Sequence, residues 1–262
     1  MLSEAEARER ILEIGGLLHR REYVAASDGN ISVRLPDGRI LATPTSMSKG
    51  YMRADDLVIT DGDGRKLAGT RNASSELAMH LLIYRLRPEV NGVVHAHPPV
   101  ATGYAAAGLP LNQALISEVV LALGCIPLAS YGTPGTPELS DALRPLIPSF
   151  DALLMANHGV VTYAEEVMRA YFKMETVEHF ARISLVAHLL GKQVLLGSRE
   201  VEKLMDARRK YEGITTAAEP VPGCPITSDA PAAAADGDRF WVSREELTRL
   251  VEEAVRGGKR RW

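Results

Sequence analysis

The sequence predicts an α/β fold of three layers, in which helices cover both faces of a mixed, largely antiparallel central sheet. Two segments, ISVRLPDGRILATP and DDLVITDGDGRKLAG, each place a turn-forming run between two strand-like runs. This arrangement is typical of β-hairpins, whose strands are antiparallel. Further along the chain, strand-like and helix-like segments alternate, as they do in layered α/β domains. Because the hairpins exclude an all-parallel sheet, the predicted sheet is mixed.

The predicted elements follow one another without an internal repeat. The first helix begins after a capping-box pattern of Ser3 and Glu6, and its apolar residues recur at helical spacing. A second helix is predicted from residues 74–75 to the residue before Pro88, and a buried strand follows in VNGVVHAH. Further helices are predicted over residues 99–107, 115–123, 137–146, 164–190 and 200–211, and strands over residues 125–130 and on each side of residues 157–159.

Composition and charge are those of a globular protein with one sizeable core. The chain has 262 residues, of which 46% are hydrophobic and 24% charged, and its net charge is -3. No basic excess indicates nucleic acid, and no apolar run reaches the roughly 20 residues of a membrane-spanning helix. The charged N-terminal segment lacks the apolar stretch of a signal peptide. Cys125 and Cys224 are expected to be free thiols in a reducing compartment, which predicts a cytoplasmic protein.

The composition changes near residue 214. Residues 215–238 contain many alanines and prolines and no aromatic residue, which is typical of a linker. We therefore expect a main domain over residues 1–214, a linker over 215–238 and a short amphipathic helical element over 239–262. Such a helix is too short to be stable alone in water, so its apolar stripe needs a partner. That partner is either the same chain, a neighbouring subunit or a separate surface within reach of the linker.

His95 and His97 are the most informative pair of polar residues. On a strand, residues i and i+2 point to the same face, so both imidazoles would converge while Ala96 faces the core. Two such histidines supply half of a zinc site. Taken alone, such a pair is more commonly explained by two surface or hydrogen-bonded histidines.

His158 and Glu76 are candidates for the rest of a site. His158 lies at the end of an apolar strand, before a glycine that permits a sharp turn. Three neutral histidines would leave the charge of Zn²⁺ uncompensated and one coordination position open. Glu76 is expected in the first turn of its helix, either as a carboxylate that stabilises the helix dipole or as a general base beside the metal.

Three short segments are rich in glycine and small hydroxyl residues: residues 27–30, 45–48 and 74–75. Backbone amides and hydroxyl groups in loops and at helix starts can bind a phosphate without a dedicated cation. Each segment could equally be a turn or a cap. Lys49 is expected to be solvated rather than to add charge to such a site.

Several motifs, taken together in this order, resemble the class II aldolase and adducin-head family, whose best-known type is an L-fuculose-1-phosphate aldolase. The resemblance extends from about residue 5 to residue 212. The motifs are GNIS (29–32), TPTSMSKG (43–50), SSELAMH (74–80), VVHAHPP (93–99), GTPGTPELS (132–140) and ANHG (156–159).

The resemblance implies a residue set. His95, His97 and His158 match the family's zinc ligands, and Glu76 matches its catalytic acid/base. Tyr211 resembles a C-terminal tyrosine that approaches the site of a neighbouring subunit in a homotetramer. The positions that match residues around the substrate phosphate are Ser27, Gly29, Asn30, Thr45, Ser46, Ser74 and Ser75.

Two positions depart from the fuculose-phosphate type. That type has glycine where this chain has Ser46, and it carries a proton-donating tyrosine in the segment that matches residues 115–118. No tyrosine lies in this segment. Glu118, Tyr131 or Tyr211 would then donate the proton, or the substrate would differ.

The resemblance implies a zinc-dependent aldolase that cleaves a short ketose phosphate to dihydroxyacetone phosphate and an aldehyde. A ketose-phosphate 4-epimerase, a dehydratase and a decarboxylase on the same fold are alternatives that need the same metal. A non-enzymatic, adducin-like interaction module is a further alternative, and it predicts loss of the histidines or of Glu76. The tether and helix resemble peptides that recruit enzymes into bacterial microcompartments, so shell proteins are an expected partner of residues 239–262.

Overall fold

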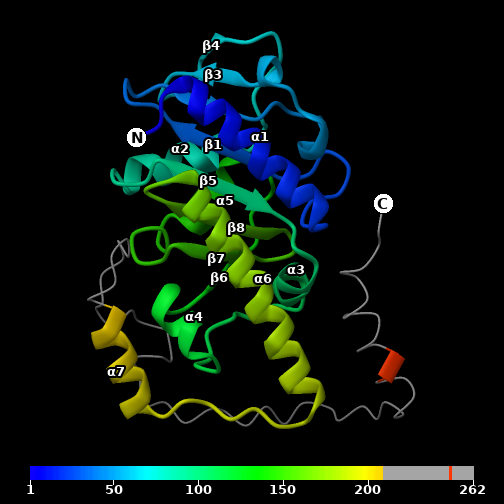
Figure 1. The fold of residues 1–262 in the computed structure, drawn as a ribbon, viewed down its shortest axis with the longest axis vertical. Coiled ribbons are helices and arrows are strands. Elements are labelled where there is room, and N and C mark those ends of the chain that lie inside the picture. Colours follow the sequence, from blue (N-terminus) through cyan, green and yellow to red (C-terminus); the bar gives the residue numbers. More distant parts are fainter. Residues whose placement is uncertain (209–247, 250–262) are drawn as a thin grey trace. The chain divides into compact units, whose positions relative to one another are not determined.

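The computed structural model describes residues 1–208 and 248–249, and a twisted sheet lies at its centre (Figure 1). The strand order is β4-β3-β2-β1-β5-β8-β7-β6. All neighbouring strands are antiparallel except β6 and β7, which are parallel, so the predicted mixed, largely antiparallel sheet is confirmed. The strands are β1 (Asn30–Arg34), β2 (Ile40–Ala42), β3 (Val58–Thr60), β4 (Lys66–Ala68), β5 (Gly92–Ala96), β6 (Leu128–Ala129), β7 (Ala152–Met155) and β8 (Gly159–Ala164).

The helices lie where the sequence predicts them, with shifts at their ends. The predicted capping box is present, because Ser3 accepts from the Glu6 amide and the Glu6 carboxylate accepts from the Ser3 amide. The helices are α1 (Glu4–Arg20), α2 (Leu77–Leu86), α3 (Pro99–Ala106), α4 (Ser117–Ala122), α5 (Pro137–Leu143), α6 (Val167–Leu189) and α7 (Ser198–Arg208), with short 3-10 helices η1 (Lys49–Tyr51) and η2 (Ala54–Asp56).

Helices cover both faces of the sheet, which confirms the three layers. Buried residues of α1, α3 and α6 form one apolar cluster with Val94 and Val160 of the sheet. Buried residues of α2 and α5 form a second cluster with Val93 and Val161. Adjacent strand residues thus belong to different clusters, because successive side chains of a strand point to opposite faces. His95 lies two residues after Val93 on the same strand, so the two side chains point to the same face of the sheet. This is the face that α2 covers.

Some predictions concern residues outside the described part of the chain. The linker, Tyr211 and most of the predicted C-terminal helix lie there, while the described Thr248 and Arg249 are helical. Cys125 is buried and belongs to a disulfide, so the expectation of a free thiol is wrong for this residue. Two cysteines about a hundred positions apart form no spacing pattern from which a pairing could be predicted. Among the described helices, none combines the length and the apolar character that a membrane span requires.

Candidate metal centre and active site

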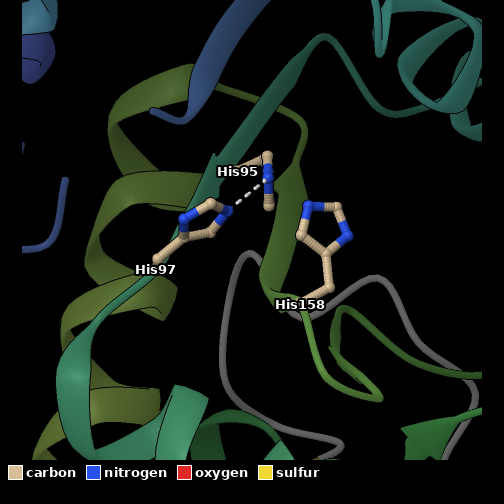
Figure 2. A group of neighbouring side chains, drawn as sticks. All are labelled: His95, His97 and His158. Carbon is tan, nitrogen blue, oxygen red and sulfur yellow. Dashed lines mark hydrogen bonds between the residues drawn. The ribbon is translucent and has the colours of Figure 1, made fainter. Parts of the chain in front are cut away.

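Three histidines meet at one end of the central strands. His95 lies on β5, where it pairs in register with Asn30 of β1 and Val161 of β8. His97 follows β5, and its Nε2 lies 3.2 Å from the Nε2 of His95, so the predicted same-face pair is present. His158 comes from the turn between β7 and β8. Figure 2 shows the three rings converging, and one ring nitrogen from each lies within 4.8 Å of the others.

The residues around His158 permit this close approach. A Cβ on Gly159 would lie 2.5 Å from Cδ2 of His97 and 2.7 Å from the carbonyl oxygen of Ala96. Only glycine fits there without displacing the ring or the strand. Asn157 adopts a φ of 55°, a left-handed conformation that asparagine tolerates better than most residues. The short sequence NHG is therefore needed to present His158 to the strand pair.

Hydrogen bonds on the outer side of the rings orient the inner nitrogens. The Nδ1 of His95 lies 2.8 Å from the carbonyl oxygen of Val160, which can only accept, so Nδ1 carries the proton. The Nδ1 of His97 lies 3.4 Å from a carboxylate oxygen of Asp28. Burial and the neighbouring His95 and His158 lower the pKa of His97 to about 4, so this ring is neutral near pH 7. The lone pairs of Nε2 thus point inward, as metal-binding histidines require.

Glu76 completes the cluster from the start of α2. Its carboxylate oxygens lie 3.3 Å from Nε2 of His95 and 3.2 Å from Nε2 of His158, and Asn30 donates to Oε2 at 2.9 Å. Glu76 is the N-cap residue of α2, one position before its first helical residue, and its side chain makes no capping hydrogen bond. The carboxylate thus lies at the positive end of the helix dipole and at the same time beside two of the histidines.

The surroundings of Glu76 keep it charged. Burial alone would raise the pKa of Glu76, but the adjacent His95 and His158 lower it well below its usual range. Oε1 is buried, and the polar contact described for it is the one with Nε2 of His158 at 3.2 Å, which lacks the geometry of a hydrogen bond. A buried acceptor without a partner is costly, so such an atom points to a missing ligand or a catalytic task.

The three segments rich in small hydroxyl residues lie next to one another beside this cluster. Residues 44 and 73 form an isolated β-bridge, which joins the segments 45–48 and 74–75. Lys49 donates to the carbonyl oxygen of Ser27 at 2.8 Å and to that of Met47 at 2.6 Å, which joins the segments 27–30 and 45–48. Lys49 is only 2% exposed, so the expectation of a solvated lysine is wrong. Its spacing in the sequence gave no sign that the ammonium group would find two buried carbonyls.

Individual positions in these segments have distinct local roles. Gly29 adopts a φ of 72°, and a Cβ there would lie 2.7 Å from the carbonyl oxygen of His95. Ser46 has a φ of 53°, a left-handed conformation that glycine adopts without strain. The hydroxyl of Ser74 accepts from the amide of Glu76, while Thr45 and Ser75 are exposed. Ser75 and Thr45 thus remain available to a ligand at this surface.

Of the three candidates for the proton donor, the structure describes Glu118 and Tyr131. Glu118 and Tyr131 are exposed, and neither makes a described hydrogen bond or ion pair with the histidines or Glu76. Tyr211 lies outside the described residues. The sequence analysis also missed two polar neighbours of the site, Asp28 and His80. His80 lies four residues after Glu76, a helical spacing that could have signalled it.

The chain belongs to the family described as the class II aldolase and adducin N-terminal domain, whose model matches residues 9–185. The resemblance seen in the motifs is thereby confirmed. The chain is 34% identical over 187 residues to a 3-oxo-tetronate 4-phosphate decarboxylase of Escherichia coli O6:H1, covering 70% of this chain and 88% of the relative.

Two further proteins that are similar to this chain are named as aldolases. A 5-deoxy-D-ribulose 1-phosphate aldolase of Bacillus thuringiensis is 33% identical over 216 residues, which cover 81% of this chain and 98% of the relative. A solved L-fuculose 1-phosphate aldolase superposes with a TM-score of 0.73 at 28% identity, covering 80% of this chain and 98% of that one. The relatives therefore share the fold but differ in the reaction.

Proposed function

We propose that the chain is a zinc-dependent class II aldolase that cleaves a short ketose phosphate to dihydroxyacetone phosphate and an aldehyde. The observation that carries this proposal is the convergence of three histidines with an ionised, partly unsatisfied Glu76. The family supplies a second reason, because aldolases of 1-phosphorylated ketoses are among the relatives. An adducin-like module has no need of such a cluster.

The residues that would hold the metal are His95, His97 and His158, through Nε2. The donor set fits zinc in chemistry and spacing: bonds of about 2.0–2.1 Å in a tetrahedral site place two ligand atoms about 3.3 Å apart. The Nε2 atoms of His95 and His97 are 3.2 Å apart. When bound, the metal supplies Lewis-acid polarisation of a substrate oxygen.

The role of Glu76 is proton transfer beside that position. Its Oε2 accepts a hydrogen bond from Asn30, whereas Oε1 has among the described residues only the 3.2 Å contact with Nε2 of His158, a nitrogen that we assign to the metal. Oε1 is therefore the atom we assign to the substrate. A positioned carboxylate there can move a proton at the carbon or hydroxyl next to the bond that breaks. The identity of the second proton donor among Glu118, Tyr131 and Tyr211 is left open by this proposal.

Phosphate binding is assigned to the joined segments. Thr45, Ser46 and Ser75 are exposed beside the cluster, and Ser74 lies next to them. Hydroxyl groups and loop amides would donate to the phosphate, and the ammonium group of Lys49 adds positive charge from behind the loops. Removal of the substrate phosphate should therefore raise KM far more than it changes kcat.

A second candidate function is decarboxylation of a phosphorylated sugar acid. It is favoured by the relative named 3-oxo-tetronate 4-phosphate decarboxylase, which is as similar to this chain as the aldolases are. A decarboxylase and an aldolase both break a carbon–carbon bond next to a carbonyl group. The metal and Glu76 would serve either reaction, so the cluster does not separate them.

A substrate panel separates the two candidates. The purified protein with zinc would be incubated with 5-deoxyribulose 1-phosphate, fuculose 1-phosphate and 3-oxo-tetronate 4-phosphate. Because either reaction would form dihydroxyacetone phosphate, the aldehyde and carbon dioxide would be measured as the distinguishing products. The proposal expects the former from a ketose 1-phosphate; carbon dioxide from the sugar acid, without aldol cleavage, would establish the second candidate. An isomeric or dehydrated product would indicate an epimerase or a dehydratase, and no turnover at all would favour an interaction module.

The remaining proposals concern assembly and location. We propose a homotetramer in which Tyr211 reaches a neighbouring site, a main domain that ends near residue 214, and a C-terminal element that binds shell proteins of a microcompartment in the cytoplasm. Truncation after Thr215 tests them together, with size-exclusion chromatography, activity assay and co-expression with shell proteins. Full activity with loss of shell association supports the tether, whereas loss of activity or of the tetramer would assign the tail to the enzyme's own assembly.

A further inference from the structure

A chain of buried hydrogen bonds leads from Glu76 into the core between α2 and β1. Asn30 donates to Glu76 at 2.9 Å, and its amide oxygen lies 2.5 Å from Nε2 of His80. The Nδ1 of His80 lies 2.7 Å from the hydroxyl of Ser32, which lies 2.8 Å from the hydroxyl of Tyr84. Asn30, Ser32, His80 and Tyr84 are all buried.

Chemistry fixes the direction of every bond in this chain. An ionised carboxylate can only accept, so the NH₂ group of Asn30 faces Glu76 and its oxygen faces His80. His80 must then carry its proton on Nε2. Because burial lowers the pKa of His80 to about 3, the ring is neutral, and its Nδ1 must accept from Ser32. The hydroxyl of Ser32 is thereby used as a donor, so Tyr84 donates to it.

The proton of Tyr84 is available for this task. Burial raises the pKa of Tyr84 above its ordinary value, so its phenol stays protonated. Tyr84, Ser32, His80 and Asn30 therefore all donate toward Glu76. An amide cannot pass a proton along such a chain at ordinary cost, so the chain orients Glu76 and does not conduct protons to it.

The orientation of Asn30 is what this chain decides. The two ends of an amide have nearly the same shape, so packing alone does not distinguish them. A turned amide would place its oxygen against the carboxylate of Glu76, and the repulsion would displace that group. Asn30 lies directly opposite His95 in the sheet register. A displacement of its amide would therefore take place next to a residue that we assign to the metal.

We propose that His80 is a positioning residue for Glu76: with Ser32 and Tyr84 behind it, its Nε2–H selects the orientation of the Asn30 amide that donates to the catalytic carboxylate. This inference rests on the proposed role of Glu76 as the acid/base. It adds His80, Ser32 and Tyr84 to the residues on which turnover depends, although no side-chain hydrogen bond described in the structure joins any of the three directly to Glu76.

Two substitutions at His80 make a matched pair. In His80→Gln, the side-chain NH₂ group can occupy the place of Nε2 and donate to Asn30. In His80→Asn, the shorter side chain can only replace Nδ1, so the hydrogen bond to Asn30 is lost. We expect His80→Asn to lower kcat by about 10–100-fold with zinc content unchanged, as for other outer residues of metal sites, and His80→Gln to restore most of it. Equal kcat values for the two variants would overturn the proposal.

A double-mutant cycle separates positioning from a general effect on the fold. In an Asn30→Ala background the amide is absent, so His80→Asn should change kcat by less than about twofold. If the two substitutions instead lower kcat additively, His80 does not act through Asn30. Thermal unfolding of each variant shows which kcat values belong to folded protein.

The protonation state of His80 can be measured without turnover, which distinguishes failure of this inference from failure of the proposed function. Nitrogen NMR of the full chain labelled at its histidines should show a neutral His80 with the proton on Nε2, assigned by its loss in His80→Gln. A proton on Nδ1, or a charged ring at pH 7, would overturn the proposal whatever the kcat values of the variants. The expected signal together with an inactive wild-type protein would instead count against the proposed reaction.

Discussion

The two ends of β7 hold two buried polar clusters of opposite character. At its beginning, Asp151 binds Arg87 at 2.9 Å through one oxygen and Lys173 at 2.8 Å through the other. Arg87 also donates to the carbonyl oxygens of Ile147 and Phe150. In this first cluster, called here the arginine cluster (Arg87, Asp151 and Lys173), both oxygens of the buried carboxylate are paired with cations.

The second cluster is called here the histidine cluster (Glu76, His95, His97 and His158). Its buried polar groups are not all paired with one another. Nδ1 of His158 is buried without a hydrogen-bond partner among the described residues, Oε1 of Glu76 meets only Nε2 of His158 without hydrogen-bond geometry, and three imidazole nitrogens converge. Buried polar groups that satisfy one another stabilise a fold, whereas unsatisfied ones indicate a ligand. The comparison assigns the arginine cluster to stability and the histidine cluster to function.

The largest effect is expected from Glu76→Gln. Removal of a general acid/base typically lowers kcat by about 10²–10⁴-fold, while the amide keeps the size and the contact with Asn30. Unfolding temperature and most of the zinc should be retained. The matched control is Glu89→Gln, which removes a carboxylate beside the arginine cluster and should leave kcat unchanged. Near-normal kcat in Glu76→Gln would remove Glu76 from the mechanism.

Asp151→Ala is expected to lower the stability of the protein and to leave its kcat unchanged. Removal of Asp151 takes one of two carboxylate partners from the buried Arg87 and the carboxylate partner described for Lys173, which should lower the free energy of unfolding by about 3–5 kcal/mol. The kcat of the folded fraction should not change. Asp141→Ala, which removes an exposed partner of Arg144, is the control and should leave stability nearly unaltered. Urea unfolding curves measure all three proteins, and a stable Asp151→Ala would break the comparison.

A smaller, pH-dependent effect is expected from Lys49. Burial lowers the pKa of Lys49 from 10.5 to about 8, so between these values the unfolded chain holds a proton that the folded chain has released. Unfolding then takes up a proton, and stability rises with pH. Relative to Lys49→Met, the wild-type protein should gain at most about 1.4 kcal/mol per pH unit between pH 8 and 10.5, and nothing below pH 8. Parallel stability curves for the two proteins across this window would show that Lys49 has an ordinary pKa.

The sequence predicted the parts of this molecule that depend on local patterns. Hairpin turns, helix caps and the i, i+2 spacing of His95 and His97 each depend on a few neighbouring residues, and the structure contains them. The parts it did not predict depend on contacts between distant segments. Lys49 finds carbonyls of two loops, Cys125 is paired, and His80 meets Asn30 fifty positions earlier. Nothing near Lys49 or Cys125 in the sequence distinguishes them from a solvated lysine or a free thiol. The spacing of His80 from Glu76 places both on one side of a helix, but it does not show that His80 meets Asn30.

Metal analysis tests the central claim most directly. The wild-type protein, purified with zinc and dialysed, should contain about one zinc per chain by mass spectrometry. His95→Ala should lose nearly all of it together with activity, whereas His179→Ala, which removes an exposed histidine of α6, should retain both. Full zinc content and full activity in His95→Ala would contradict the assignment of the histidine cluster as a metal centre.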